Sequence, residues 1–253
     1  MDGSSTPKYR KKQNTNGTQM SNESINILDK GYVRLVDHMG DDLSSVNAAR
    51  VSYDKESNVL STRDEKLLSF LLREGHTSPF RHAAVCYEVY APLFVARQWW
   101  KYAVASSHVD DQNGWNESSR RYITEEPVFH IPDATGWRMA PDNSKQGSGE
   151  KFGEGMGSYF SKRLGEVIDI SLREYNAALQ MGVAPEQARL FLAAYGMYVR
   201  WRWTTSLQGV LHFLSQRLEH DAQEEIQLYA QAVHRLTEPL YPVTFNAFLG
   251  TKT

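Results

Sequence analysis

The stretch AAVCYEVYAPLFVARQWWKY, residues 83–102, indicates the fold because its pattern changes from strand to helix at one proline. Residues 83–92 are rich in β-branched and aromatic side chains, which favour a pleated strand. Pro92 suits the first turn of a helix, where a missing N–H costs nothing, so we expect residues 92–102 to be helical. A strand joined this directly to a helix predicts a sheet with helices packed against it.

Outward from this stretch, helical patterns outnumber strand patterns. Residues 31–40 and 197–203 alternate as strands do. Residues 61–76 carry leucines on one helical face and begin with a capping box between Thr62 and Glu65. The other expected helices are at residues 41–53, at 164–182, from Pro185 onward, and one long helix over residues 204–236.

These elements predict an α+β fold, with a small mostly antiparallel sheet packed by long helices in a single domain over residues 25–253. Residues 1–24 have almost no apolar side chains to bury, so we expect a disordered polar tail.

Composition excludes several classes of protein. A formal net charge of −2 gives no basic field for nucleic acid, so we expect no nucleic-acid partner. The one cysteine, Cys86, forms no internal disulfide, and its apolar strand predicts an inert buried thiol. No apolar run is long enough to span a membrane, and we expect a cytoplasmic protein, in the host cytoplasm if the chain is viral.

Residues 97–122, RQWWKYAVASSHVDDQNGWNESSRRY, mix cations with flat aromatic rings. Guanidinium forks beside aromatic faces suit a ligand that is both anionic and planar, such as a nucleotide or a flavin. Ser118 and Ser119 add short hydrogen-bond donors of the kind that hold a phosphate. The same composition fits a solvated basic helix whose tryptophans pack in the core, and it leaves both interpretations open.

Two weaker clusters lie outside this segment. Residues 76–82 are polar and lie between a helix and a strand, where binding loops are common, although a turn at Pro79 explains them equally. Arg217 follows His212 on the expected last helix and fits either a ligand site or a surface ion pair. The histidine pairs lack the spacing of a zinc signature, so we expect no metal site.

Five segments follow one another along the chain: ILDKGYVRLVDHMGDDLSSVNAARVSY, GHTSPFRH, RQWWKY with WNESSRRY, APEQARLFL, and SLQGVLHFLSQRLEHDAQEEI. In this order they make the chain resemble the flavin-dependent thymidylate synthase family over residues 25–248. The resemblance implies a homotetramer whose active sites are shared between subunits, with FAD as cofactor and NAD(P)H as its reductant. It implies that dUMP becomes dTMP with methylenetetrahydrofolate as carbon donor and without a cysteine nucleophile.

By position, the resemblance assigns Arg217 as the catalytic residue at the uracil edge. A fixed cation there favours ionisation of the ring and polarises it toward attack. The implied FAD-binding residues are Ser52, His76, Ser78, Arg81, Lys101, Tyr102, Ala103, Val104, Glu117, Ser206, Leu207, Gln208 and His212. The implied dUMP-binding residues are Gln98, Trp99, Trp100, Lys101, Glu117, Ser118, Ser119, Arg120, Arg121, Arg189 and Arg217.

The chain departs from the family pattern at several positions. The family's Arg-His-Arg triplet reads Lys101-Tyr102-Ala103 here, and SHVDDQNG lengthens the spacer that follows. Lysine offers a point charge where arginine offers a fork. Arg81 stands at a position where the family commonly has a carboxylate. At the positions of Ser206, Gln208 and His212 the family more usually has Asn and Arg. Two alternatives therefore accompany the leading hypothesis: flavin-dependent hydroxymethylation of dUMP, and a catalytically inactive nucleotide- or RNA-binding homologue.

Overall fold

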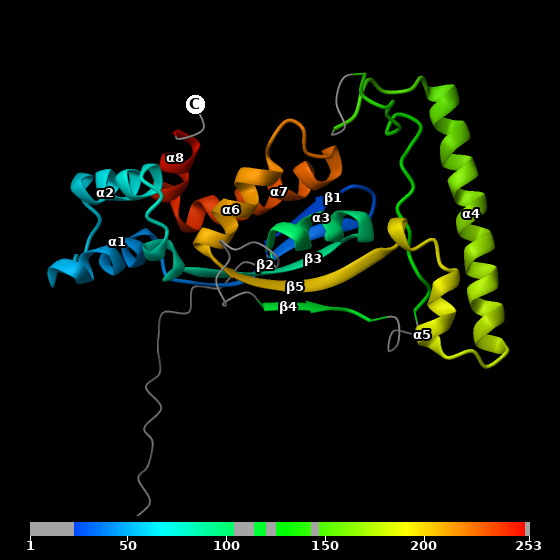
Figure 1. Ribbon diagram of the computed structural model, residues 1–253, viewed down its shortest axis with the longest axis horizontal. Helices are drawn as coiled ribbons and strands as arrows, with labels where there is room; N and C mark the ends of the chain where they lie inside the picture. The colour runs from blue at the N-terminus through cyan, green and yellow to red at the C-terminus, as the bar shows by residue number, and fades with distance from the viewer. Residues whose placement is uncertain (1–22, 104–113, 120–124, 143–146, 251–253) are drawn as a thin grey trace, which may run out of the picture.

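A five-stranded antiparallel sheet forms the centre of the computed structural model, which describes residues 23–103, 114–119, 125–142 and 147–250 (Figure 1). The strand order is β1-β2-β3-β5-β4, and every neighbouring pair is antiparallel. The strands expected at residues 31–40 and 83–92 are confirmed, whereas the two short strands carried no pattern strong enough to predict. The strands are β1 (Ser24–Ile27), β2 (Gly31–Met39), β3 (Ala84–Pro92), β4 (Gly114–Glu117) and β5 (Tyr198–Ser206).

Helices α3 (Leu93–Ala103), α6 (Leu207–Arg217) and α7 (Glu224–Thr237) lie together over one face of this sheet (Figure 1). Helices α1 (Asp42–Arg50), α2 (Thr62–Arg73) and α8 (Pro242–Gly250) gather at one end of the molecule. At the other end stand α4 (Glu154–Gln180) and the single turn α5 (Pro185–Ala188). The α+β class with a small antiparallel sheet is therefore confirmed, and the layers leave the opposite sheet face without a helix in the described ranges.

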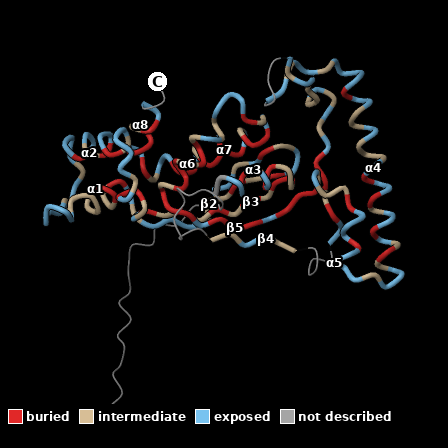
Figure 2. The backbone as a smooth tube through the Cα atoms, in the orientation of Figure 1, coloured by how far each residue is buried: buried red, intermediate tan, exposed pale blue. Residues whose placement is uncertain are grey.

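Aromatic side chains fill the space between the sheet and its helices. Trp99 of α3 has no exposed surface and stacks on Phe213 of α6 with ring centroids 4.5 Å apart. Trp201 and Trp203 of β5 meet the same indole edge-to-face, each at 5.4 Å. Figure 2 shows buried residues concentrated along this layer, while much of α2 and α4 is exposed. The alternation along β5 explains the pattern, because Trp201 and Trp203 point inward while Arg200 and Arg202 are exposed.

The expectation of one long helix over residues 204–236 is wrong. Strand β5 continues to Ser206, whose side chain accepts a hydrogen bond from the Gly209 N–H and caps α6. Helix α6 ends at Arg217, and α7 begins only at Glu224. The apolar spacing stays in phase across the break, so periodicity alone does not reveal it. As a result, Arg217 lies at a helix end rather than in mid-helix.

Smaller differences concern helix ends. The capping box of α2 joins Ser61 to Asp64 rather than Thr62 to Glu65, one residue earlier than predicted. Pro92 is the last residue of β3 and not the first of the helix. Helix α8, which the sequence did not predict, is anchored by the buried carboxylate of Asp42, which accepts from the Val243 N–H at 2.8 Å and the Thr244 N–H at 3.0 Å.

Cys86 is half-buried on β3, whereas a fully buried thiol was expected. Strand alternation is the reason, because Val85 and Tyr87 take the core-facing positions on either side. Within the described ranges no helix is both long and apolar enough to cross a membrane.

Candidate functional site

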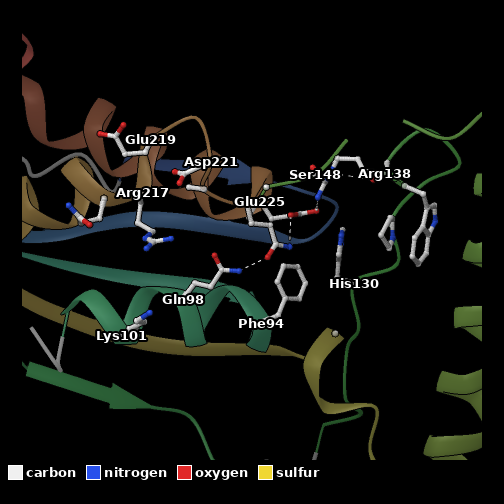
Figure 3. Close-up of a pocket in the computed structure, with 18 of the residues that line it drawn as sticks. Phe94, Gln98, Lys101, His130, Arg138, Ser148, Arg217, Glu219, Asp221 and Glu225 are labelled. Carbon is white, nitrogen blue, oxygen red and sulfur yellow. Dashed lines mark hydrogen bonds and ion pairs between the residues drawn. The ribbon is translucent and has the colours of Figure 1, made fainter. Parts of the chain in front are cut away.

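A cavity lies between α3, the end of α6 and the start of α7, and we call it the Arg217 cavity (Figure 3). Its volume is about 840 Å³, in the range of ligand sites. Phe94, Gln98 and Lys101 line it because they follow one another at helical spacings of four and three on the same face of α3. Arg217 points into the same space from the end of α6, toward Gln98 and Lys101.

A chain of polar contacts forms one wall of the Arg217 cavity. The Gln98 amide donates to the Gln223 carbonyl oxygen, and the Gln223 amide donates to Glu225 Oε2 at 2.7 Å. The guanidinium of Arg138 donates to Glu225 Oε1 at 2.6 Å and to Glu224 Oε2 at 2.7 Å. We call Gln223, Glu225 and Arg138 the relay, because they connect Gln98 to the loop that precedes α4.

His130 lines the Arg217 cavity, and a contact with Asp29 holds its ring. Its Nδ1 lies 2.8 Å from Asp29 Oδ1, which also accepts from the Tyr198 hydroxyl at 2.6 Å. Desolvation of Asp29 works against its ionisation, but the hydrogen bonds from Tyr198 and His130 outweigh this and lower its pKa. The contacts fix the His130 segment to the β1–β2 turn and to β5.

A second cavity of about 600 Å³, the Arg189 cavity, lies beside β4 and β5. Pairing of the two strands continues past β4, since the Ser118 N–H donates to the Arg200 carbonyl at 2.8 Å. This places Ser118 next to Arg200, whose guanidinium lies 5.5 Å from the ring centroid of Tyr90. Arg189 comes from the 3₁₀ turn after α5, and Glu117 and Ser119 complete the predicted residues in this cavity.

Glu117 is one of three acidic residues that line the Arg189 cavity, together with Glu125 and Glu126. Protein atoms around its carboxyl desolvate it and raise its pKa, while the Trp115 side chain acts in the opposite direction through a hydrogen bond. Two arginines and two serines of this cavity can donate hydrogen bonds to an anion, and three carboxyl groups line the same cavity.

A third, smaller cavity of about 210 Å³ lies between α6 and the segment after α2. His76, Gln208 and His212 line it with Thr77 and Ser215, over an apolar floor that includes Phe80 and Leu211. Imidazole, carboxamide and hydroxyl groups above apolar side chains fit part of a flavin, which is both planar and rich in hydrogen-bonding atoms. The volume is too small for a whole dinucleotide.

Three of the residues predicted to bind a ligand are buried in this structure. Trp99 and Leu207 have no exposed surface, and Ser206 is buried with its hydroxyl committed to the α6 cap. These residues form the core and the strand–helix junction instead. Trp100 is exposed, but it meets the Arg97 guanidinium at 5.8 Å and lines none of the three cavities.

Other predicted contacts lie elsewhere or outside the described ranges. Ser52 and Ser78 are exposed and Arg81 is half-buried, and none of them lines the three cavities. Val104, Arg120 and Arg121 lie outside the described residues, as do the side chains of Tyr102 and Ala103.

The relay residues and His130 are the site residues that sequence reasoning missed. The only available signal was the acidic start of α7, where Glu224 and Glu225 suit a helix N-terminus. Their contact with Arg138, 86 and 87 residues away, has no counterpart in the local pattern.

Comparison with known proteins places this chain in a family. The family model described as thymidylate synthase complementing protein matches residues 34–243. The flavin-dependent thymidylate synthase of Thermosipho africanus is 37% identical over 223 residues, covering 88% of this chain and 92% of that protein. That of Thermotoga neapolitana is 36% identical over 228 residues, covering 89% and 94%.

Among solved structures, a UMP/dUMP methylase of Streptomyces cacaoi bound to 5-Br dUMP is similar, with a TM-score of 0.76 and 28% identity. The match covers 89% of this chain and 97% of that one. The fold is thus shared with a UMP/dUMP methylase. The chain belongs to the flavin-dependent thymidylate synthase family.

Proposed function

We propose that this chain converts dUMP to dTMP, with methylenetetrahydrofolate as carbon donor and FAD as cofactor, in the manner of its relatives. The observation that carries the proposal is the Arg217 cavity, where Gln98, Lys101 and Arg217 converge from two helices. The similar methylase bound to a dUMP analogue supports a pyrimidine nucleotide as ligand. When bound, reduced FAD supplies the hydride, and NAD(P)H restores its reduced state.

Each side chain in the Arg217 cavity has a distinct role in this proposal. Arg217 places a permanent cation against a carbonyl of the uracil ring and draws electron density from C6, the position that accepts a hydride. Gln98 orients the ring through its amide, and Lys101 contributes a point charge at the mouth of the cavity. Partial burial of Arg217 strengthens its field, because less water screens it.

We further propose a homotetramer with active sites shared between subunits. Arg189 and Arg217 line different cavities of one protomer, with Ser118, Ser119 and Glu117 beside Arg189. A phosphate held by Arg189 and a uracil held by Arg217 are brought to one nucleotide when neighbouring copies meet. The third cavity, which His76, Gln208 and His212 line, supports the same idea, since it accommodates only part of a flavin. The lone cysteine is consistent with a reducing, cytoplasmic compartment.

The direct test is turnover by the purified protein. We expect yellow protein that oxidises NAD(P)H in a dUMP-dependent way and releases dTMP, identified by mass spectrometry. A hydroxymethylated nucleotide as product would show that the enzyme hydroxymethylates dUMP instead of methylating it. Binding of dUMP without any turnover would indicate an inactive homologue, and protein that binds no FAD would refute the proposal.

Complementation between two variants tests the shared site. Arg189→Ala and Arg217→Ala should each be inactive, and each should still assemble as a tetramer in sedimentation. When the two variants are unfolded and refolded together, mixed tetramers contain some sites with both arginines, so part of the activity should return. If mixed protein stays as inactive as either variant alone, the two arginines serve the same protomer's site.

A further inference from the structure

The amide of Gln98 faces two different neighbours in the Arg217 cavity. A glutamine side chain presents a carbonyl acceptor on one side and an NH₂ donor on the other, and half a turn exchanges them. Its partners therefore decide which way it faces. The NH₂ group donates to the Gln223 carbonyl oxygen, and Figure 3 shows the Gln98 carbonyl oxygen turned the other way, toward the Arg217 guanidinium.

The relay leaves one consistent assignment of donors and acceptors. Arg138 only donates, so Glu225 accepts from it with one carboxylate oxygen and keeps the second oxygen as an acceptor. Gln223 therefore turns its NH₂ to Glu225 and its carbonyl to Gln98. Gln98 in turn gives its NH₂ to Gln223, which leaves its carbonyl for the opposite side. The orientation of the Gln98 amide thus begins with Arg138, on the loop before α4.

Burial protects this assignment from exchange with water. Glu225 is buried, and the Arg138 side chain is only 16% exposed. Water therefore competes poorly for their hydrogen bonds, and an amide turned the wrong way leaves a buried donor or acceptor unsatisfied. For this reason the relay holds Gln98 in a single orientation.

The Arg217 guanidinium has acidic neighbours on its other side. Arg217 is the last residue of α6, and Glu219 and Asp221 follow it in the connection to α7. Both carboxylates line the Arg217 cavity, and Figure 3 shows them above Arg217, with Gln98 below it. A carbonyl oxygen attracts a guanidinium, whereas an NH₂ group in the same place repels it. The orientation of the Gln98 amide therefore decides whether the guanidinium stays toward Gln98 or turns toward the carboxylates.

We propose that the relay residues are positioning residues, which act through the Gln98 carbonyl to hold the Arg217 guanidinium at the pyrimidine site. This inference rests on the proposed function, because it takes Arg217 as the residue at the uracil edge. It agrees with a ring that ionises beside a cation. The Gln98 carbonyl is used on Arg217, and the N–H that Gln98 has left over is a donor for a ring oxygen.

Glu225→Gln reverses the relay with a single substitution. Arg138 still requires an acceptor, so the introduced amide turns its oxygen to Arg138 and its NH₂ to Gln223. Gln223 and Gln98 then both turn over, and Gln98 presents its NH₂ to Arg217. In the flavin-loaded full-length protein, kcat for dTMP formation should fall about tenfold or more, or by about 1.4 kcal/mol. Calorimetry should show weaker dUMP binding, and the melting temperature reports whether the fold is kept.

A second substitution separates the direction of the relay from a simple loss of structure. Arg138→Met alone keeps Glu225 as an acceptor, so the Gln98 amide keeps its orientation. In the double variant with Glu225→Gln, the introduced amide no longer has to accept from Arg138, and its oxygen can again accept from Gln223. Attraction between Arg217 and the Gln98 carbonyl then restores the original orientation, so kcat should return to within about threefold of Arg138→Met alone. A purely structural role predicts the reverse, because the double variant loses more contacts.

Glu224→Gln is the matched control for the loss of charge. Glu224 also accepts from Arg138, but its side chain is 47% exposed, and in the described ranges it makes no hydrogen bond to Gln223. The change therefore removes a neighbouring charge without reversing the relay. Its kcat should stay within about twofold of the wild-type value.

A variant at Gln98 covers the case in which the double variant does not fold. Gln98→Met keeps about the same side-chain length but has no amide to orient, so adding Glu225→Gln to it should change kcat by less than about twofold. The inference is overturned if Glu225→Gln keeps the wild-type kcat, if Arg138→Met does not restore it, or if its effect persists without the Gln98 amide. Wild-type protein that forms no dTMP refutes the proposed function, and the inference that rests on it falls as well.

Discussion

Replacing Trp99 tests whether this residue serves the core or contacts the ligand. The indole has no exposed surface, and three aromatic rings contact it at centroid distances of 4.5 to 5.4 Å. Trp99→Ala therefore should cost about 3–5 kcal/mol, as large-to-small substitutions in cores do. At about 2–4 °C per kcal/mol for a chain of this size, the melting temperature should fall by roughly 6–20 °C.

Trp99→Phe is the sharper test. It keeps a ring against Phe213 and removes the indole N–H, which has no hydrogen-bond partner within the described part of the chain. Relief of that buried donor, about 1–3 kcal/mol, offsets much of the lost burial, so we expect a net loss below about 2 kcal/mol. Urea unfolding measures the stability, and calorimetry measures dUMP binding by the folded protein, which should stay within twofold. Near-normal stability with dUMP binding weakened more than tenfold would refute the core assignment.

Three further outcomes follow from other contacts. Asp42→Asn sets an NH₂ group against the N–H donors at the start of α8 and should cost about 1–2 kcal/mol, seen as a fall in melting temperature of roughly 2–8 °C. The lowered pKa of Asp29 means that its contribution to stability is present above its usual value of 3.8 and is lost as pH falls through its folded pKa. The stability advantage of the wild type over Asp29→Asn should therefore shrink in acid unfolding experiments below that pH. Removing residues 1–22 should leave turnover unchanged, as expected for a polar tail outside the 25–253 domain. A large loss of turnover would show that the tail has a role.

Short-range patterns account for the elements that were predicted well. β2 and β3 alternate, and α2 repeats its leucines every three or four residues, because side chains of one element face its neighbours at fixed spacing. The same reasoning failed at residues 218–223, where the apolar phase continues through a break in the helix. It also failed to distinguish Trp99 from Trp100, since adjacent residues differ in burial only through what packs above them.

By itself, the sequence determined the fold class, most of the central elements and the family, because ordered motifs and periodicity are written into neighbouring residues. Tertiary structure alone decided which of those residues share a cavity. Gln98 and Gln223 are 125 positions apart, and Arg138 and Glu225 are 87 apart. Such contacts depend on the path of the whole chain, which places α3, α7 and the loop before α4 around one space. Residue types show what chemistry is available, but only this convergence shows which groups act on the same ligand.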